Sequence, residues 1–171
     1  SNGATLQVGY GLKLWEFATG ATIESSPALG QNGYLYIGSD NGKLYAIDTK
    51  TANKVWEFAT GQRIASAPTI DANGTVYLAS GNGKLYALNG ETGVEKWQFQ
   101  AGSWTQTSPA IGPDGTVYVG TANGANSSNK MYGINGSTGA KIWETSGFGE
   151  LHSSPSVGAN GLVYFGSNGS K

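Results

Sequence analysis

Residues 66–99 read SAPTIDANGTVYLASGNGKLYALNGETGVEKWQF, and this stretch decides the fold. Short runs rich in β-branched and aromatic residues alternate in it with turns rich in Gly and Asn, as expected for half-buried strands. We expect four strands, called A to D, at 66–70, 75–79, 84–88 and 96–99. Three tight turns in one such unit leave no room for a helix, so the stretch predicts a four-stranded antiparallel meander.

The same unit recurs along the whole chain. Tryptophans mark the repeat with steps of 41, 41 and 46 residues, at Trp15, Trp56, Trp97 and Trp143. Periods of roughly 40–45 residues are typical of propeller blades or of helical arrays. The turn-rich β composition favours blades, and an enlarged B–C connection at 121–129 explains the longer step.

Two kinds of turn repeat with the strands. The A–B turns carry Asn-Gly or Asp-Gly, as at Asn73-Gly74, and this pair predicts type I′ hairpins. The C–D turns carry a glycine four residues before each Trp. One copy has Ala52 there instead, beside Asn53, which tolerates a left-handed conformation.

Composition excludes several classes of protein. The 171 residues carry a net charge of −1, no Cys and only ten Lys and Arg, which are scattered along the chain. A nucleic-acid surface needs clustered basic residues, and no apolar stretch approaches the length of a membrane span. Disulfides and thiolate zinc sites are excluded, and no cluster of His, Asp and Glu has metal-ligand spacing.

One segment carries a family resemblance. Residues 86–97, YALNGETGVEKW, resemble the tryptophan-docking motif of quinoprotein-type (PQQ-like) β-propellers, Ala-x-Asp-x-x-Thr-Gly-x-x-x-Trp. Two further copies match it, with Ala52 for the glycine in one, and with Gly133 for the alanine and Asn135 for the aspartate in the other. In the first copy only Gly11 and Trp15 remain. The resemblance implies that Trp15, Trp56, Trp97 and Trp143 are structural and pack between adjacent blades.

The expected architecture is an all-β propeller of four-stranded antiparallel blades, with residues 1–171 as a single PQQ-like domain or half-propeller. Three blades are complete. The fourth is shared between C and D strands at 4–8 and 14–17 and A and B strands at 154–157 and 162–165. Closure within one chain predicts a ring of four blades, and closure between two chains predicts an eight-bladed homodimer. We favour the dimer, because the resemblance implies rings of about eight blades; a third alternative is that the chain is half of a longer polypeptide.

Candidate binding residues lie in the D–A connections, which differ between copies. In a propeller the D–A and B–C loops gather on one face, and alternate residues of an extended segment share a side. We expect a polar and aromatic site there, with Trp104, the Trp outside the docking register, as a stacking platform. Its polar members are Arg63, Glu24, Gln106, Glu150 and His152. The alternative is that these loops vary freely and carry polar residues for solubility.

Catalysis is not expected. The resemblance suggests a quinone-dependent dehydrogenase, but those enzymes carry a calcium site, a catalytic Asp and often a vicinal disulfide. Here Asp48, Asp71 and Asp114 fall in tight turns, and Asp40 stands alone in a B–C loop. One His without an organised nucleophile makes no catalytic set. We therefore expect no catalytic residue, no metal and no cofactor.

The expected function is a non-catalytic scaffold for protein–protein interaction or assembly, presenting the D–A and B–C loop face. The resemblance implies an extracytoplasmic location, periplasmic or secreted, although the chain shows no signal peptide. The expected partners are another protein or a second copy of the chain, not nucleic acid or a membrane. The alternative is a module for carbohydrates or small ligands built on Trp104, and a less favoured one is a remnant of a PQQ-dependent dehydrogenase.

Overall fold

The computed structural model describes residues 3–7, 13–102, 105–122, 129–147 and 149–168, and every regular element in these ranges is a β-strand. The first blade has β3 (Ala28–Leu29), β4 (Tyr34–Gly38), β5 (Lys43–Asp48) and β6 (Lys54–Ala59). The second has β7 (Thr69–Ile70), β8 (Thr75–Ala79), β9 (Lys84–Asn89) and β10 (Glu95–Gln100). The third has β11 (Ala110–Ile111), β12 (Thr116–Gly120), β13 (Lys130–Asn135) and β14 (Lys141–Ser146).

Two shorter sheets flank the three blades. The N-terminal half-blade pairs β1 (Gly3–Gln7) with β2 (Lys13–Ala18), and the C-terminal half-blade pairs β15 (Ser156–Val157) with β16 (Val163–Tyr164). Each complete blade is an antiparallel meander in the order A-B-C-D. The all-β fold, the blades and the two half-blades are therefore confirmed, and strand A is shorter than expected.

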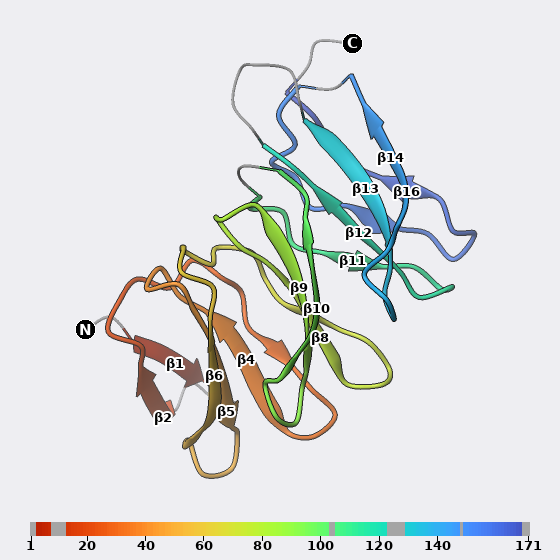
Figure 1. The fold of residues 1–171 in the computed structure, drawn as a ribbon. Coiled ribbons are helices and arrows are strands. Elements are labelled where there is room, and N and C mark those ends of the chain that lie inside the picture. Colours follow the sequence, from red (N-terminus) through yellow and green to blue (C-terminus); the bar gives the residue numbers. More distant parts are fainter. Residues whose placement is uncertain (1–2, 8–12, 103–104, 123–128, 148, 169–171) are drawn as a thin grey trace.

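The five sheets lie side by side along an arc, with the two half-blades at its opposite ends (Figure 1). Strands A of neighbouring blades touch each other: Thr69 Oγ1 donates to the Pro109 carbonyl at 2.6 Å, and the Ser108 amide donates to Ser154 Oγ at 2.9 Å. Within the described ranges the half-blades share no sheet. The four-bladed closure within one chain is thus not the arrangement of this structure.

The hydrophobic core lies between blades rather than within any one of them. Val76 and Leu78 of β8 pack against the first blade, while Tyr77 between them packs against the third. All three side chains are almost fully buried. Because both faces of a middle sheet are covered in this way, its strands B and C are apolar on both sides, and each blade depends on its neighbours for burial.

The turn geometry corrects two expectations. In the A–B turns only the glycines have positive φ, for example Gly74 at 76°, whereas Asn73 does not. These turns are therefore not of type I′, which requires positive φ at both central residues. In the C–D turn of the first blade Ala52 itself, and not Asn53, adopts the left-handed conformation, with φ 60°.

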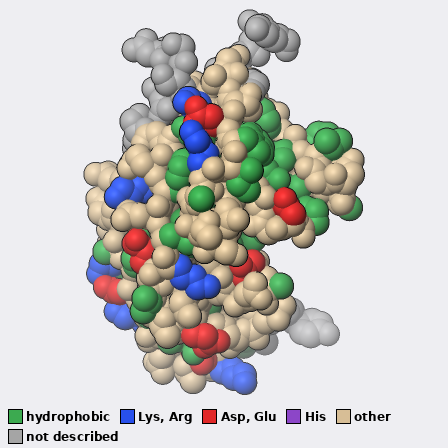
Figure 2. Space-filling model, turned by 45° about the vertical axis from the view of Figure 1, so that its right-hand side comes forward, with side chains coloured by type: hydrophobic (Ala, Val, Ile, Leu, Met, Phe, Trp, Pro, Cys, Tyr) green, Lys and Arg blue, Asp and Glu red, His purple; other side chains and the backbone are tan. Residues whose placement is uncertain are grey.

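The surface shows no single charged patch in the view of Figure 2, where acidic and basic side chains are interspersed. Hydrophobic side chains gather on the side that carries the C-terminal strands. The exposed hydrophobic residues there include Tyr164 of β16 and Leu162, just before this strand. No described segment forms an apolar helix of membrane-spanning length.

Candidate functional site

The D–A connections and the B–C loops meet on one side of the arc, called here the loop face. A buried side chain anchors each of two D–A connections: Ile64 and Leu151 are both fully buried. Ile64 packs against Gly38 of the first blade so closely that a Cβ at Gly38 would lie 2.4 Å from its side chain. The residues on either side of Ile64 and Leu151 are at least partly exposed, so the predicted alternation along these segments is present.

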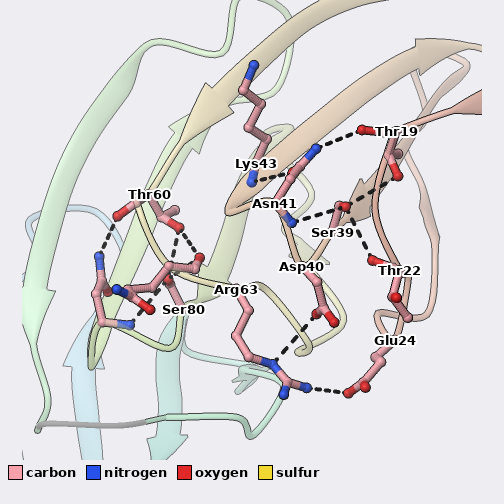
Figure 3. A network of polar contacts seen from close by, with 12 residues as sticks. Thr19, Thr22, Glu24, Ser39, Asp40, Asn41, Lys43, Thr60, Arg63 and Ser80 are labelled. Carbon is pink, nitrogen blue, oxygen red and sulfur yellow. Dashed lines mark hydrogen bonds and ion pairs between the residues drawn. The ribbon is translucent and has the colours of Figure 1, made fainter. Parts of the chain in front are cut away.

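Arg63 forms the centre of a polar cluster on this face (Figure 3). Its guanidinium pairs with the Glu24 carboxylate, and its Nε lies 3.6 Å from Asp40 Oδ1. At this distance Arg63 and Asp40 form an ion pair without a hydrogen bond. Arg63 Nε and Asp40 Oδ1 are both buried. Arg63 belongs to the second blade, whereas Glu24 and Asp40 belong to the first, so the cluster bridges two blades.

A repeated hydrogen-bond network supports the B–C loops beside this cluster. Ser39 Oγ donates to Thr19 Oγ1 in the first blade, and Ser80 Oγ donates to Thr60 Oγ1 in the second. Asn41, and Asn82 in the next copy, likewise donate to the carbonyls of those threonines. Contacts that recur from blade to blade serve the scaffold. In the next blade Ala65 and Gly81 occupy the positions of Glu24 and Asp40, so the carboxylates of the Arg63 cluster do not recur there.

The other predicted site residues are not joined to this cluster. Glu150 and His152 lie together, with His152 Nε2 3.0 Å from Glu150 Oε2. Gln106 is partly buried in the third blade. Trp104 lies outside the described residues. The structure therefore brings the predicted residues together as two separate pairs, and it adds Asp40, which the sequence placed alone in its loop.

The loop face is acidic over the described residues. Glu24, Asp40 and Glu150 contribute three carboxylates; Arg63 pairs with the first two, and Glu150 lies apart beside His152. Glu24 is half exposed, with 51% of its side chain accessible, so it remains open to a further contact. This arrangement suits basic groups of a partner. Within the described ranges no three His, Cys, Asp or Glu side chains are grouped closely enough to hold a metal ion.

The opposite side of the arc, called the turn face, carries the A–B and C–D turns and a small cavity of about 160 Å³. Asp71 lines it, but its carboxylate is already used: Oδ1 accepts the amides of Asn73 and Thr75, and Oδ2 accepts the Tyr77 hydroxyl. Burial, and then the Asp71 charge, raise the pKa of Tyr77 above its ordinary value. Both carboxylate oxygens of Asp71 therefore stabilise its own turn. For this reason the loop face is a stronger candidate for a binding site than the cavity.

The four docking tryptophans occupy the blade contacts. The indole N–H of Trp56 donates to the Gly90 carbonyl of the second blade at 2.9 Å, and Trp97 donates to Gly136 of the third at 2.9 Å. Trp15 makes a longer bond of 3.2 Å to Thr49. Trp143 has no such acceptor among the described residues and is only partly buried.

The sequence could have signalled Asp40. It occupies the position of Gly81 in the second blade, immediately after the serine that supports the B–C loop in these two blades. A carboxylate that replaces glycine at a loop position next to a D–A segment differs between copies just as Arg63 does. The sequence does not show that Asp40 and Arg63 are close in space, because they lie in different blades and only the packing of the blades brings them together.

Comparison with known proteins identifies the relatives of this fold. A family model described as outer membrane protein assembly factor BamB matches residues 5–170. A comparison with curated protein sequences found no significant match.

Several solved structures are similar. BamB from Moraxella catarrhalis aligns with a TM-score of 0.74 and 22% identity, over 91% of this chain and 47% of that one. The computationally designed Ika8 protein aligns at 0.78 and 18%, over 94% and 48%. A europium-containing methanol dehydrogenase aligns at 0.68 and 21%, over 80% and 27%. The chain thus spans about half the length of the first two structures, and at these identities the similarity shows the fold.

Proposed function

Because this chain belongs to the family of the outer membrane protein assembly factor BamB, we propose that it is a non-catalytic scaffold that holds another protein during assembly at the outer membrane. The observation that supports this role is the family match over residues 5–170. The proposed location is extracytoplasmic, as the family description implies.

The loop face is the proposed partner surface. Its side chains differ from blade to blade, whereas the turn face repeats the same backbone contact, in which the C–D turn amides of Thr49, Gly90 and Gly136 donate to the A–B turns. A surface built only of repeated turns has little means to distinguish one partner from another. The acidic residues Glu24, Asp40 and Glu150 favour a partner with exposed Lys or Arg, because complementary charge speeds association and suppresses wrong partners.

We propose no catalytic role. Arg63 is held between two carboxylates, and the side-chain partner of His152 among the described residues is Glu150, so no nucleophile is set beside His152 there. The carbohydrate alternative rests on Trp104, which lies outside the described residues.

Site-specific photocrosslinking in a bacterial envelope tests the proposal. A photoreactive amino acid is placed at His152 on the loop face and, as a matched control, at Ala72 on the turn face; both positions are exposed. We expect a covalent adduct with a component of the outer membrane protein assembly machinery from His152 and not from Ala72. Mass spectrometry identifies the adduct.

Charge reversal provides a second control. Glu24→Lys is expected to weaken the adduct, whereas Glu91→Lys, an exposed glutamate on the turn face, leaves it unchanged. Equal labelling from the two faces, or no protein adduct from either, would contradict the scaffold role. Specific binding on a glycan array without a protein adduct would favour the carbohydrate alternative instead.

A further inference from the structure

The A–B turn of the second blade is closed by a different side chain from the other A–B turns. In the first blade Asn32 Oδ1 accepts the Tyr34 amide at 3.1 Å. The residue at the same position accepts an amide in two further turns, at Asp114 and Asn160. In the second blade the acceptor is Asp71, two residues earlier, whose Oδ1 takes the Thr75 amide at 2.8 Å. The side chain of Asn73, which corresponds to Asn32, is therefore not used to close its turn.

The reason for this exchange is a glycine. Asp71 stands where the other A–B turns carry glycine, at Gly30, Gly112 and Gly158. A Cβ built on Gly30 would lie 2.5 Å from Asn32 Oδ1, so the Asn side chain fills the space beside the glycine. Two side chains cannot occupy that space together. Asp71 occupies it in the second blade, and Asn73 is left exposed.

Asn73 differs in this respect from the other Asn-Gly pairs of the chain. Seven pairs have both residues described, at Asn32, Asn41, Asn73, Asn82, Asn89, Asn135 and Asn160. In six of them at least one hydrogen bond holds the carboxamide. The Asn73 carboxamide has no hydrogen-bond partner among the described residues, and Gly74 after it is also exposed.

An unrestrained Asn before Gly can react with its own backbone. The Gly74 amide nitrogen loses its proton and attacks Asn73 Cγ, so that an N–Cγ bond forms, the Cγ–Nδ2 bond breaks, and Nδ2 leaves with the proton as ammonia. Water then opens the resulting succinimide at either carbonyl, which gives aspartate or isoaspartate. Glycine favours the attack because it has no side chain to hinder the approach, and around Gly74 a Cβ would meet nothing within 4 Å.

We propose that Asn73 is a site of spontaneous deamidation in the folded protein, and that Asp71 is the residue that makes it one. The backbone restrains this turn no differently from its equivalent in the first blade: the Gly74 amide donates to the Asp71 carbonyl at 3.1 Å, and the Gly33 amide donates to Gly30 at 3.1 Å. The difference therefore lies in the side chain. This assignment goes beyond the scaffold role and does not depend on it, because Asn73 lies on the turn face.

One product of the reaction affects a blade contact. Isoaspartate at position 73 adds one atom to the backbone before Gly74. The Gly74 carbonyl accepts the Gly90 amide at 3.0 Å, and the Gly90 carbonyl accepts the Trp56 indole N–H at 2.9 Å. Displacing Gly74 therefore weakens the support of the docking turn, the C–D turn that contacts Trp56. Aspartate keeps the backbone length, and Asp114 already occupies this position in the third blade.

Peptide mapping compares the Asn-Gly pairs within one native chain. The folded protein is kept at mildly alkaline pH and digested at intervals, and mass spectrometry follows the conversion of each amide to an acid. We expect Asn73 to deamidate about tenfold faster than Asn32, the factor that corresponds to one hydrogen bond. In urea, where the fold is lost, the two rates should converge. Equal rates in the folded protein would overturn the proposal.

Two reciprocal variants test the role of Asp71. Asp71→Gly gives the second blade the glycine of the other turns, so Asn73 can close the turn, and its deamidation is expected to slow by about tenfold. Gly30→Asp is expected to release Asn32 and to accelerate its reaction. Near-UV circular dichroism checks that each variant is folded. An unchanged rate at Asn73 in folded Asp71→Gly would show that Asp71 does not control the site, and the comparison in the native chain needs neither variant.

The effect on the blade contact has its own measurement. Protein that has aged to isoaspartate at position 73 is separated from unreacted protein by ion exchange, and its urea unfolding is compared with that of Asn73→Asp. Both carry the same added charge, and only the aged protein has the longer backbone. We expect the aged protein to unfold at a lower urea concentration. Equal midpoints would show that the lengthened turn leaves the contact at Trp56 intact.

Discussion

The contact between the second and third blades differs from the contact at the C-terminal end of the arc, although both begin with the same side chains. Val117 and Val119 of β12 are fully buried against the second blade, whereas Val163 of β16, at the position of Val117, is only partly buried against the third. Trp97 has its hydrogen-bond acceptor and Gly139 of the following blade against its ring. Trp143 has no such acceptor among the described residues, and the glycine against its ring, Gly133, belongs to its own blade. The comparison teaches that a blade contact needs all four strands of the following blade, because strands C and D supply the docking turn.

The largest expected effect comes from removing an interior docking residue. Trp97→Ala should lower the free energy of unfolding by about 3–5 kcal/mol, because it removes a large buried ring and leaves a cavity between two blades. Trp15→Ala should cost less, by at least about 1 kcal/mol, since Trp15 is less buried and makes the longer bond. Urea unfolding at one fixed protein concentration measures both, and equal losses would remove the distinction between interior and end contacts.

The next effect isolates the glycine that lies against the indole. Gly93→Ala should cost about 2–4 kcal/mol, from left-handed strain plus a methyl group forced against the Trp56 ring. Gly74→Ala is the matched control: φ is 76°, but open space surrounds the added Cβ, so only the strain of about 1–2 kcal/mol remains. If both variants lose the same stability, close approach to the Trp is not what the docking turn requires.

A smaller effect is expected in the opposite direction at the one docking turn without glycine. Ala52→Gly removes left-handed strain of about 1–2 kcal/mol from the folded state. It also increases the entropy of the unfolded chain, which costs about 0.4–1 kcal/mol. The free energy of unfolding should therefore rise by about 0.5–1 kcal/mol. Ala72→Gly, where φ is not positive, should be destabilising. A loss of stability in Ala52→Gly would mean that the methyl group contributes to packing at the Trp15 contact.

The smallest effect concerns charge on the outer strands of the third blade. Hydrogen bonds from Lys130 and Lys141 lower the pKa of Glu144 to about 2, from 4.5. A lowered folded pKa contributes stability that is present above the unfolded value and is lost as the pH falls through the folded value. The free energy of unfolding should therefore fall as the pH is lowered from 4.5 to 2, and the fall should be smaller in Glu144→Gln. Urea unfolding at a series of pH values measures this profile. An unchanged profile in Glu144→Gln would show that other carboxylates govern it.

Sequence reasoning located most of the fold because the determining signals are local. The alternation at Thr75–Ala79 and the turns on either side of it predict β8 from adjacent residues alone. The predicted turn type was wrong at Asn73-Gly74, because this pair of residues permits several turns. The hydrogen bond from the Gly74 amide to the Asp71 carbonyl belongs to the turn that is formed. Within the candidate site, Arg63 and Glu24 were identifiable from the differences between copies, but their contact with each other and with Asp40 was not.

The sequence by itself determined the strands and their order within a unit, since these depend on residues only a few positions apart, and the recurrence of the same pattern along the chain determined the repeat and the register of its tryptophans. The tertiary structure alone decided how the blades are set against one another. It joined Arg63 to Glu24 and Asp40 across a blade contact, and it held the two half-blades apart at the ends of an arc. The physical reason is that blade-to-blade rotation results from the packing of whole apolar faces, in which no short segment specifies the angle.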